Sequence, residues 1–284
     1  MKKVALVTAA SARTLDEDLP PLVQALAAVG IPAEPVVWDD AAVDWAAYGL
    51  AVVRSTWDYT PRRDEFVAWA ERVESLTRLE NSAATLRWNT DKRYLRELVG
   101  RGIPVVPTHW IEPGDAARFP FDGPFVVKPA VSAGAKDTAR YSPADEKPAT
   151  DHVRRLQATG RVVMVQPYLA QLDEAGETGM IYLDGVYSHA IRKGAILRSD
   201  LKYVGGLYAT EDIGRRDPTE PERRLAEQVL AAVPRTLYAR VDVAPGPEGD
   251  PLLLELELTE PSLFFACSDG AEHRLARAIA RRLE

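Results

Sequence analysis

The chain has 284 residues, of which 46% are hydrophobic and 27% are charged, and its formal net charge is −7. Eighteen glycines and 21 prolines are too few for a disordered or collagen-like chain, and no stretch approaches the roughly 20 apolar residues of a membrane span. An acidic chain without a block of lysines and arginines also lacks the clustered positive charge of a general nucleic-acid binder. We therefore predict a globular protein with no nucleic-acid or membrane partner.

Cysteine and histidine usage narrows the chemistry further. The single cysteine, Cys267, cannot form an internal disulfide, and the four histidines lack the spacing of zinc ligands. The apolar run after Lys2 and Lys3 is only about five residues long, too short for the hydrophobic part of a secretory signal. The run predicts a first β-strand, and together these features predict a protein of the reducing cytoplasm.

The first 80 residues alternate between strand and helix patterns. Short apolar runs indicate buried strands, and apolar residues three or four apart indicate helices. This order predicts a parallel sheet covered by helices, that is, a Rossmann-like N-terminal domain over residues 1–80. The expected strands are 3–9, 36–38 and 50–54, and the expected helices are 16–30 and 64–73.

Residues 54–59, Arg-Ser-Thr-Trp-Asp-Tyr, follow the third expected strand. Ligands of parallel sheets bind beyond the carboxyl ends of the strands, so this segment is a candidate binding element. Trp57 and Tyr59 are equally well explained as aromatic residues packed at a buried corner. Arg54 and Asp58 are harder to explain as core residues.

The pattern changes after residue 80. Asp184-Gly185 between two apolar runs is the strongest hairpin signal in the chain. Antiparallel pairs interspersed with helices predict an α+β region after the α/β region. The expected helices are 90–98, 151–158 and 220–232, and the expected strands are 105–110, 125–129, 162–168, 179–183, 186–192, 237–243 and 252–258.

The last two expected strands carry a cluster of charged residues. Because side chains alternate along a strand, Arg240 and Asp242 share one face, and so do Glu255 and Glu257. Carboxylates gathered on one sheet surface suit Mg²⁺, which prefers oxygen ligands. The competing interpretation is a solvent-exposed face, with the leucines at even positions from 252 to 258 packed inward. The hairpin alone favours that second interpretation.

Two further segments favour a phosphate ligand. Lys128 ends an apolar run and precedes a loop of small residues, 130–136, which suits backbone N–H groups that close over phosphate oxygens. Neither a Walker loop nor a Gly-x-Gly-x-x-Gly motif is present. Lys92 is either a second cation for the phosphates or a solvated helix residue. Residues 166–169 are either a hinge that binds an adenine edge or an ordinary strand end.

In this order, the segments resemble those of the ATP-grasp superfamily, from about residue 81 to 260. The resemblance implies an ATP-grasp fold over residues 81–284, with a small ATP-binding subdomain at about 112–170 and a C-terminal subdomain at 171–284. Lys92 and Lys128 match the two lysines that contact phosphate. The adenine hinge corresponds to Gln166, Pro167, Tyr168 and Leu169.

The resemblance extends to the remaining charged residues. Glu177 corresponds to the acid that binds ribose, and Arg240 to the arginine that holds phosphate and the tetrahedral intermediate. The implied metal ligands are Asp242, Glu255 and Glu257. Glu257 replaces the usual asparagine, which keeps an oxygen ligand but adds negative charge.

The family activity implied is ATP-dependent ligation, with two Mg²⁺ ions for which Mn²⁺ can substitute. ATP phosphorylates a carboxylate, and an amine-type nucleophile displaces phosphate from the acyl phosphate to leave ADP and phosphate. An arginine binds a carboxylate in a forked geometry, so Arg54, with Asp58 and Glu17, is expected to hold an amino-acid-like substrate. Arg192 and Lys193 lie near the expected phosphates, and Arg198 and Lys202 are further candidates there.

Residues 54–59, 188–193 and 260–264 are similar to the subgroup that contains the cyclo-ligase of antibiotic biosynthesis that makes D-cycloserine from O-ureido-D-serine, alongside relatives that form linear amide bonds. Ring closure of one substrate is therefore the leading specific hypothesis. An intermolecular ligase of the glutathione-synthetase or D-alanine–D-alanine-ligase type is the first alternative, and a non-catalytic ATP-binding regulator is the second. A homodimer and a monomer are both left open.

Overall fold

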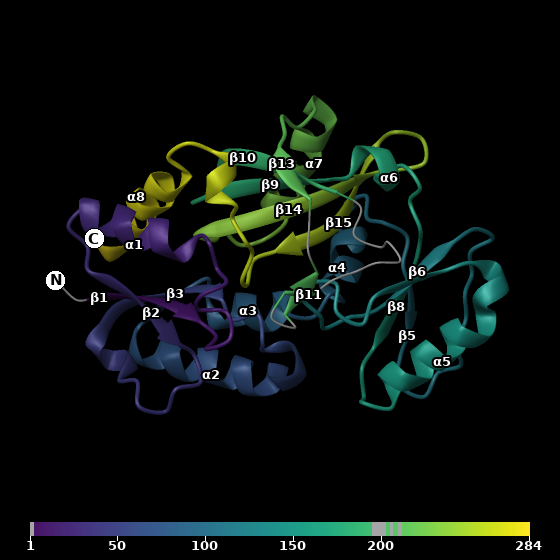
Figure 1. The fold of residues 1–284 in the computed structure, drawn as a ribbon, viewed down its shortest axis with the longest axis horizontal. Coiled ribbons are helices and arrows are strands. Elements are labelled where there is room, and N and C mark those ends of the chain that lie inside the picture. The colour runs from purple at the N-terminus through teal and green to yellow at the C-terminus, as the bar shows by residue number, and fades with distance from the viewer. Residues whose placement is uncertain (1–2, 195–202, 205–206, 210–211) are drawn as a thin grey trace.

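The computed structural model describes residues 3–194, 203–204, 207–209 and 212–284, which form mixed α/β structure with four sheets (Figure 1). The N-terminal sheet is parallel, with strand order β2-β1-β3-β4. It confirms the parallel α/β arrangement predicted there and adds a short fourth strand. Its elements are β1 (Lys3–Thr8), α1 (Leu19–Ala28), β2 (Ala33–Val37), β3 (Tyr48–Ser55), α2 (Arg63–Leu76) and β4 (Arg78–Glu80), with short 3₁₀ turns at Trp45–Ala47 and Thr60–Arg62.

Helix α1 illustrates how the sequence sets these elements. Pro20 and Pro21 occupy its first turn, where a missing N–H does no harm. Its buried face carries Leu22 and Leu26, one turn apart. Gly30 follows with a φ of 77°, a conformation that favours glycine and ends the helix.

The helix predicted at 90–98 is confirmed only from residue 94, as α4 (Tyr94–Gly100), and a separate helix that was not predicted, α3 (Ala83–Asn89), precedes it. Ser82 caps α3 by accepting a hydrogen bond from the Thr85 N–H. In the turn between the two helices, the Lys92 N–H donates to the Ala130 carbonyl at 3.0 Å. Lys92 is therefore held in a turn against the loop that follows Lys128.

The next unit is an antiparallel sheet of order β5-β8-β6-β7, packed against one helix (Figure 1). Its elements are β5 (His109–Ile111), β6 (Phe125–Pro129), β7 (Ala139–Tyr141), a 3₁₀ turn (Pro143–Asp145), α5 (Glu146–Gln157) and β8 (Val163–Pro167). The strand expected at 105–110 is shorter than predicted, because Val105 instead forms an isolated bridge with Leu253.

The largest sheet is antiparallel, with order β13-β10-β9-β14-β15. The predicted hairpin at Asp184-Gly185 is confirmed, and both residues have positive φ, as a tight turn of this kind requires. The elements of this region are α6 (Leu172–Ala175), β9 (Glu177–Leu183), β10 (Val186–Lys193), β11 (Tyr203–Val204), β12 (Tyr208–Ala209), β13 (Ile213–Arg215), α7 (Glu220–Ala231), β14 (Tyr238–Pro245) and β15 (Pro251–Glu257).

The register of β14 and β15 brings the charged residues together. Arg240 pairs with Glu257 and Asp242 pairs with Glu255, so all four side chains lie on one face, as the alternation predicts. A bulge follows, because Val243 pairs with Leu253 and leaves residue 254 unpaired. The prediction that the leucines at even positions from 252 to 258 all pack inward is therefore wrong in part. Residue 253 is buried together with residues 256 and 258, while residue 254 faces a cavity.

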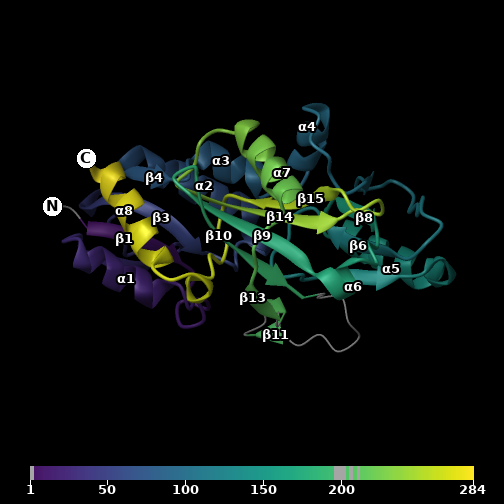
Figure 2. The same ribbon diagram turned by 90° about the horizontal axis from the view of Figure 1, so that it is seen from above.

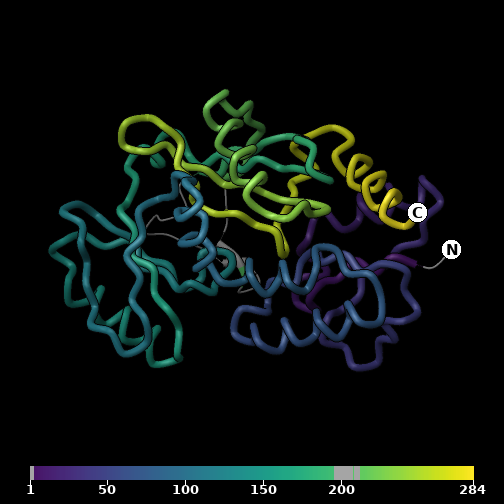
Figure 3. Tube along the Cα trace, turned by 180° about the vertical axis from the view of Figure 1, so that it is seen from behind, coloured from purple at the N-terminus to yellow at the C-terminus, as the bar shows by residue number. Residues whose placement is uncertain are grey.

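The chain ends with a 3₁₀ turn (Phe265–Cys267) and α8 (Ala271–Leu283), a helix that the sequence reading did not predict. Helix α8 lies beside α1 (Figures 1 and 2), and the tube view places the C-terminal end next to the N-terminal sheet (Figure 3). Leu22 of α1 and Leu275 of α8 share one apolar core with β9 and β10. Among the described residues, no helix has both the length and the apolar character to cross a membrane.

Candidate active site

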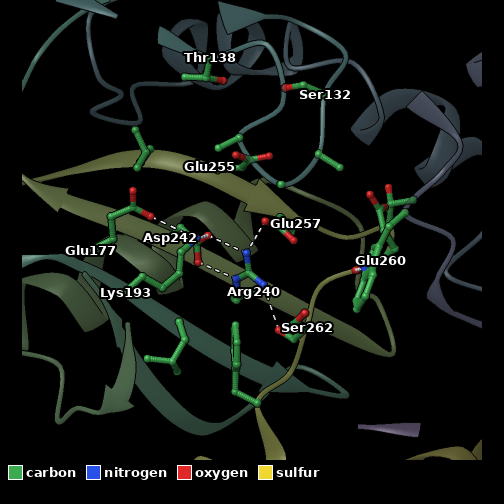
Figure 4. A pocket seen from close by; sticks show the side chains of 18 of the residues that line it. Ser132, Thr138, Glu177, Lys193, Arg240, Asp242, Glu255, Glu257, Glu260 and Ser262 are labelled. Carbon is green, nitrogen blue, oxygen red and sulfur yellow. Dashed lines mark hydrogen bonds and ion pairs between the residues drawn. The ribbon is translucent and has the colours of Figure 1, made fainter. Parts of the chain in front are cut away.

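A cavity of about 970 Å³ lies where the three units meet. Its wall includes β6, β8, β14, β15, the loop after β6 and the segments after β3 and β15. The charged residues of β14 and β15 form its floor, with Glu177 and Glu260 on opposite sides of them (Figure 4). The volume is at the upper end of ordinary ligand sites, which is enough for a nucleotide together with a small second substrate.

Arg240 and Asp242 form the centre of the floor. The Arg240 guanidinium donates to both Asp242 oxygens, at 2.8 and 3.0 Å, and Lys193 Nζ approaches the same carboxylate at 3.0 Å. Burial raises the pKa of Asp242, but Arg240 and Lys193 outweigh burial and bring it down to about 2. Asp242 is therefore ionised, and its charge is already matched by cations.

The two glutamates of β15 face the cavity and keep 26% of their side-chain surface exposed. Lys92 Nζ lies 3.0 Å from a Glu255 oxygen, and Arg240 is paired with Glu257. Burial acts to raise the pKa of Glu255, but Lys92 and Lys128 hold it below its usual value. Burial, opposed by Arg240 but reinforced by Glu255, raises the pKa of Glu257 to about 7. The interpretation of this hairpin as a fully solvent-exposed face is wrong, because its acids line a cavity and are paired with cations.

The small-residue loop after β6 closes over the floor. Lys128 faces the cavity, and burial lowers the pKa of its ammonium to about 8. Lys92 Nζ donates to the Ser132 carbonyl at 2.7 Å, which joins the loop to the α3–α4 turn. Gly134 and Ala135 both have φ near 60°, so the loop turns sharply where it lines the cavity.

The hinge residues predicted for adenine also line the cavity. Gln166 is buried, and its amide donates to the Thr108 hydroxyl at 2.9 Å. The Tyr168 N–H donates to the Pro124 carbonyl at 2.8 Å, and Pro167 and Leu169 lie on either side of it on the cavity wall. Glu177 lies 3.2 Å from Lys193 Nζ. The structure thus brings the predicted cations, hinge and acids to one place, while their roles stay predictions.

The three carboxylates predicted as metal ligands fit a magnesium ion only in part. They supply hard oxygen donors on neighbouring strands, which suits Mg²⁺. In the part of the chain that the structure describes, however, no three acidic, histidine or cysteine side chains are close enough to hold a metal by themselves. A metal here would need further oxygen ligands, and nucleotide phosphates are the ordinary source of these for Mg²⁺.

Residues 259–265 form the wall on the Glu260 side, and the N-terminal region holds this segment by its backbone. The Asp18 carboxylate accepts hydrogen bonds from three successive N–H groups, those of residues 263, 264 and 265, at 2.7–3.0 Å. Arg54 donates to the Pro261 carbonyl at 3.1 Å, and Trp57 Nε1 donates to the Glu260 carbonyl at 3.1 Å. A shift of the N-terminal region would therefore move this wall.

The large sheet holds the same segment from the other side. Arg240 donates to the Ser262 carbonyl at 3.0 Å, and His189 Nε2 lies 2.8 Å from the Leu263 carbonyl oxygen. The Tyr238 hydroxyl donates to the Thr259 carbonyl at 2.9 Å. The pKa of His189 is lowered, chiefly by burial, which fits a structural role for this histidine.

The residues predicted to bind substrate are not all brought to the cavity. Arg54 is 1% exposed and Asp58 is bonded to Trp38 Nε1 at 2.9 Å and to Arg62, and neither lines the cavity in the described structure. Glu17 does line it and is exposed. Arg54 acts on the site through its contact with the 259–265 segment. The sequence could not predict this contact, because the two segments lie some 200 residues apart in the chain.

Of the remaining predicted residues, some line the cavity and others do not. Lys193 is buried on the cavity floor, whereas Arg192 donates to the carbonyls of Glu174 and Ala175 and does not line the cavity. Cys267 lines the cavity and is partly buried. Arg198 and Lys202 lie outside the described residues.

Glu260 and Tyr59 are among the cavity residues that received no binding role from the sequence. Burial, reinforced by Glu257 and opposed by Lys92 and by the Tyr59 hydroxyl, raises the pKa of Glu260 to about 8. A signal was present, since both residues lie in segments used for the subgroup resemblance. Their proximity could not be inferred, because it depends on how the segment after β15 returns across the carboxyl end of β3.

The fold places the chain among ATP-grasp structures. A D-alanine–D-alanine ligase from Bacillus anthracis superposes with a TM-score of 0.69 at 15% identity, covering 100% of this chain and 97% of that one. An ATP-grasp ligase PsnB, solved with a minimal precursor, Mg and ADP, gives 0.65 at 19% identity, covering 99% of this chain and 97% of that one. At these identities the likeness establishes the ATP-grasp fold alone.

Closer relatives define the family. Residues 4–81 match the family described as the N-terminal domain of D-cycloserine synthetase DcsG. The cycloserine biosynthesis protein DcsG of Streptomyces lavendulae is 42% identical over 99% of both chains. The crystal structure of D-cycloserine synthetase DcsG superposes with a TM-score of 0.90 at 39% identity, covering 99% of both chains. The chain belongs to the DcsG family of ATP-grasp ligases, so the hypothesis of a non-catalytic regulator is not supported.

Proposed function

We propose that this ligase closes O-ureido-D-serine into D-cycloserine, with ATP and Mg²⁺ as the activating pair. One observation carries the proposal: the cavity of a DcsG-family chain pairs acids of β14 and β15 with cations from these and neighbouring elements, beside a separate wall that carries an acid with no ion pair among the described residues. The first set suits a nucleotide triphosphate, and the second suits a small amino acid.

Lys92, Lys128, Lys193 and Arg240 would hold the phosphates of ATP, and residues 166–169 and Glu177 its nucleoside. Four cations are needed because the triphosphate and the substrate carboxylate repel each other. Asp242, Glu255 and Glu257 would hold Mg²⁺, which neutralises phosphate charge when bound. Two metal ions and substitution by Mn²⁺ stay predictions, as do a cytoplasmic location and a homodimer.

The reaction begins when a substrate carboxylate oxygen attacks the γ-phosphorus and ADP leaves. The substrate nitrogen bonded to oxygen then attacks the acyl carbon, phosphate leaves, and the ring closes. Since cycloserine lacks the ureido carbonyl, the balance also requires hydrolytic loss of a carbamoyl group. In these steps the chain holds the reacting groups in line and neutralises charge, with Arg240 close to the acyl oxygen.

A substrate panel tests the proposal. The protein, ATP and Mg²⁺ are incubated with O-ureido-D-serine, D-alanine, D-serine and their L isomers, and nucleotides are separated by chromatography. We expect ADP and phosphate in equal amounts with O-ureido-D-serine and only background hydrolysis with the others. Release of AMP, or equal activity with D-alanine, would contradict the proposed reaction.

A further inference from the structure

The acids of the cavity differ in what they face. Asp242 faces Arg240 and Lys193, and Glu255 faces Lys92. Glu257 is likewise paired with Arg240, and Glu177 with Lys193. Among the described residues, no lysine or arginine forms an ion pair with Glu260. Glu257 and Glu255 act to raise the pKa of its carboxyl group, and Lys92 opposes them without pairing with it. A partly buried carboxyl group that lacks an ion-pair partner is a place where a ligand cation gains most.

Glu260 is also held in a fixed position. Trp57 Nε1 binds its carbonyl, and the next residue is held by Arg54. The Tyr59 hydroxyl interacts with its carboxyl group, and the Tyr59 ring is stacked on Phe66 with centroids 4.9 Å apart. Tyr59 is only 3% exposed, so this hydroxyl is held in place before any ligand arrives.

The location suits the amino end of an amino acid. In an α-amino acid the ammonium and the carboxylate are attached to the same carbon, so their binding sites must be adjacent. The Ser262 carbonyl is bonded to Arg240, which ties the segment carrying Glu260 to the cation at the centre of the floor (Figure 4). A substrate carboxylate near Arg240 would therefore place its ammonium toward Glu260.

The other acids on this side differ from Glu260 in their surroundings. The Asp18 carboxylate accepts three backbone hydrogen bonds. Asp16 accepts one hydrogen bond from the Asp18 N–H, and its other oxygen is buried without a hydrogen-bond partner, but the positive charge of Arg54 acts on this carboxylate. Glu17 is exposed at the cavity wall, where water competes for its charge. Among these acids, Glu260 is the one whose segment is tied to Arg240 through the Ser262 carbonyl, and it forms no ion pair within the described residues.

We infer that Glu260, supported by the Tyr59 hydroxyl, binds the α-ammonium group of the amino-acid substrate. The inference rests on the proposed function for the identity of the substrate. It names a different residue from the sequence prediction, which assigned the amino-acid end to Arg54, Asp58 and Glu17.

Binding of two matched ligands tests the inference without turnover. Calorimetry with Mg²⁺ and a non-hydrolysable ATP analogue compares O-ureido-D-serine with the analogue in which hydrogen replaces the α-ammonium. Wild type should prefer the amine by about 10- to 100-fold, the usual range for a hydrogen bond between charged groups. In Glu260→Gln the preference should fall below about threefold, while affinity for the deaminated ligand is unchanged.

Matched variants exclude a general loss of structure. Glu17→Gln should keep the wild-type preference, and Tyr59→Phe should reduce it by about threefold. If Glu260→Gln fails to bind the nucleotide analogue, Tyr59→Phe and Glu260→Asp, which keeps the charge, decide the matter. If the preference for the amine ligand is unchanged in the Glu260 and Tyr59 variants, the inference is overturned. If that preference is lost in Glu17→Gln, the ammonium-binding role belongs to Glu17 instead.

The outcomes separate the inference from the proposed function. If wild type binds both ligands equally yet forms product, the inference fails and the proposed function stands. If wild type shows the amine preference but forms no ring-closed product, the inference stands and the proposed function fails. No binding of either ligand to wild type would contradict both.

Discussion

On the Glu177 side of the cavity, acids on neighbouring strands face lysines and an arginine, whereas on the Glu260 side an acid sits in an irregular segment without a matching cation. The first side is organised by strand register and charge pairs within the ATP-grasp region. The second side is organised by residues 259–265, which the N-terminal region holds by their backbone. The side proposed to bind the nucleotide is therefore organised within one region of the chain, while the other side depends on the contact between two regions.

The largest expected effect comes from the charge-paired side. Glu255→Gln removes a carboxylate and leaves Lys92 without its partner, so turnover should fall about 10²- to 10³-fold. ADP release under saturating substrate is the measurement. Glu248→Gln, in the exposed turn of the same hairpin, is the matched control and should keep wild-type turnover. Retained turnover in Glu255→Gln would mean that the hairpin acids take no part in the reaction.

The next effect should separate the two sides. Asp18→Ala removes the acceptor of three backbone hydrogen bonds, so the free energy of unfolding should fall by about 3 kcal/mol. Because the Glu260 wall loses its anchor, KM for the amino acid should also rise about tenfold, with little change in KM for ATP. Denaturant unfolding and steady-state kinetics measure both. Glu17→Ala, one residue away and exposed, should change stability little, and an equal rise in both KM values would break the comparison.

The sequence alone predicted part of the charge-paired side of the cavity. The alternation of charges in β14 and β15 predicted which face Arg240, Asp242, Glu255 and Glu257 share, because side-chain direction on a strand is a local property. The bulge at residue 254 was not predicted, since it depends on how β15 pairs with its neighbour.

The Glu260 side of the cavity could not be predicted from local sequence patterns, because its contacts join residues that are far apart in the chain. Arg54 was correctly singled out as unusual for a core, yet its partner is a carbonyl 207 residues later in the chain. The same holds for Asp18, whose bonds cross 245 to 247 residues. Such contacts follow from tertiary packing, which also produced α8 against α1. Local patterns therefore predicted well which residues gather on the Glu177 side of the cavity and poorly which residues form the Glu260 side.

A smaller effect is expected from removing one hydrogen bond to the Glu260 wall. Trp57→Phe keeps an aromatic ring but removes the N–H that binds the Glu260 carbonyl. The loss should be about 1 kcal/mol, which corresponds to about a fivefold rise in KM for the amino acid. Steady-state kinetics with saturating ATP measure this rise. Trp110→Phe, in β5, serves as a control and should leave this KM unchanged.

The smallest effect concerns pH. Burial, aided by Arg274 and opposed by bonding to Leu263 and by Asp18, lowers the pKa of His189 below 6.5. Its neutral form therefore favours folding, so this contribution is fully present above pH 6.5 and is lost as pH falls through the lowered pKa. Unfolding at pH 7 and at about pH 5.5 should show a larger drop in wild type than in His189→Gln. An identical pH dependence in the two proteins would remove His189 from the account.

The most direct test of the central claim is the product formed from one substrate. Mass spectrometry of a reaction that contains the protein, ATP, Mg²⁺ and O-ureido-D-serine should reveal D-cycloserine, formed in a one-to-one ratio with ADP. An uncyclised amide that joins two substrate molecules, or ADP release without a ring-closed product, would contradict the claim and favour the intermolecular ligase.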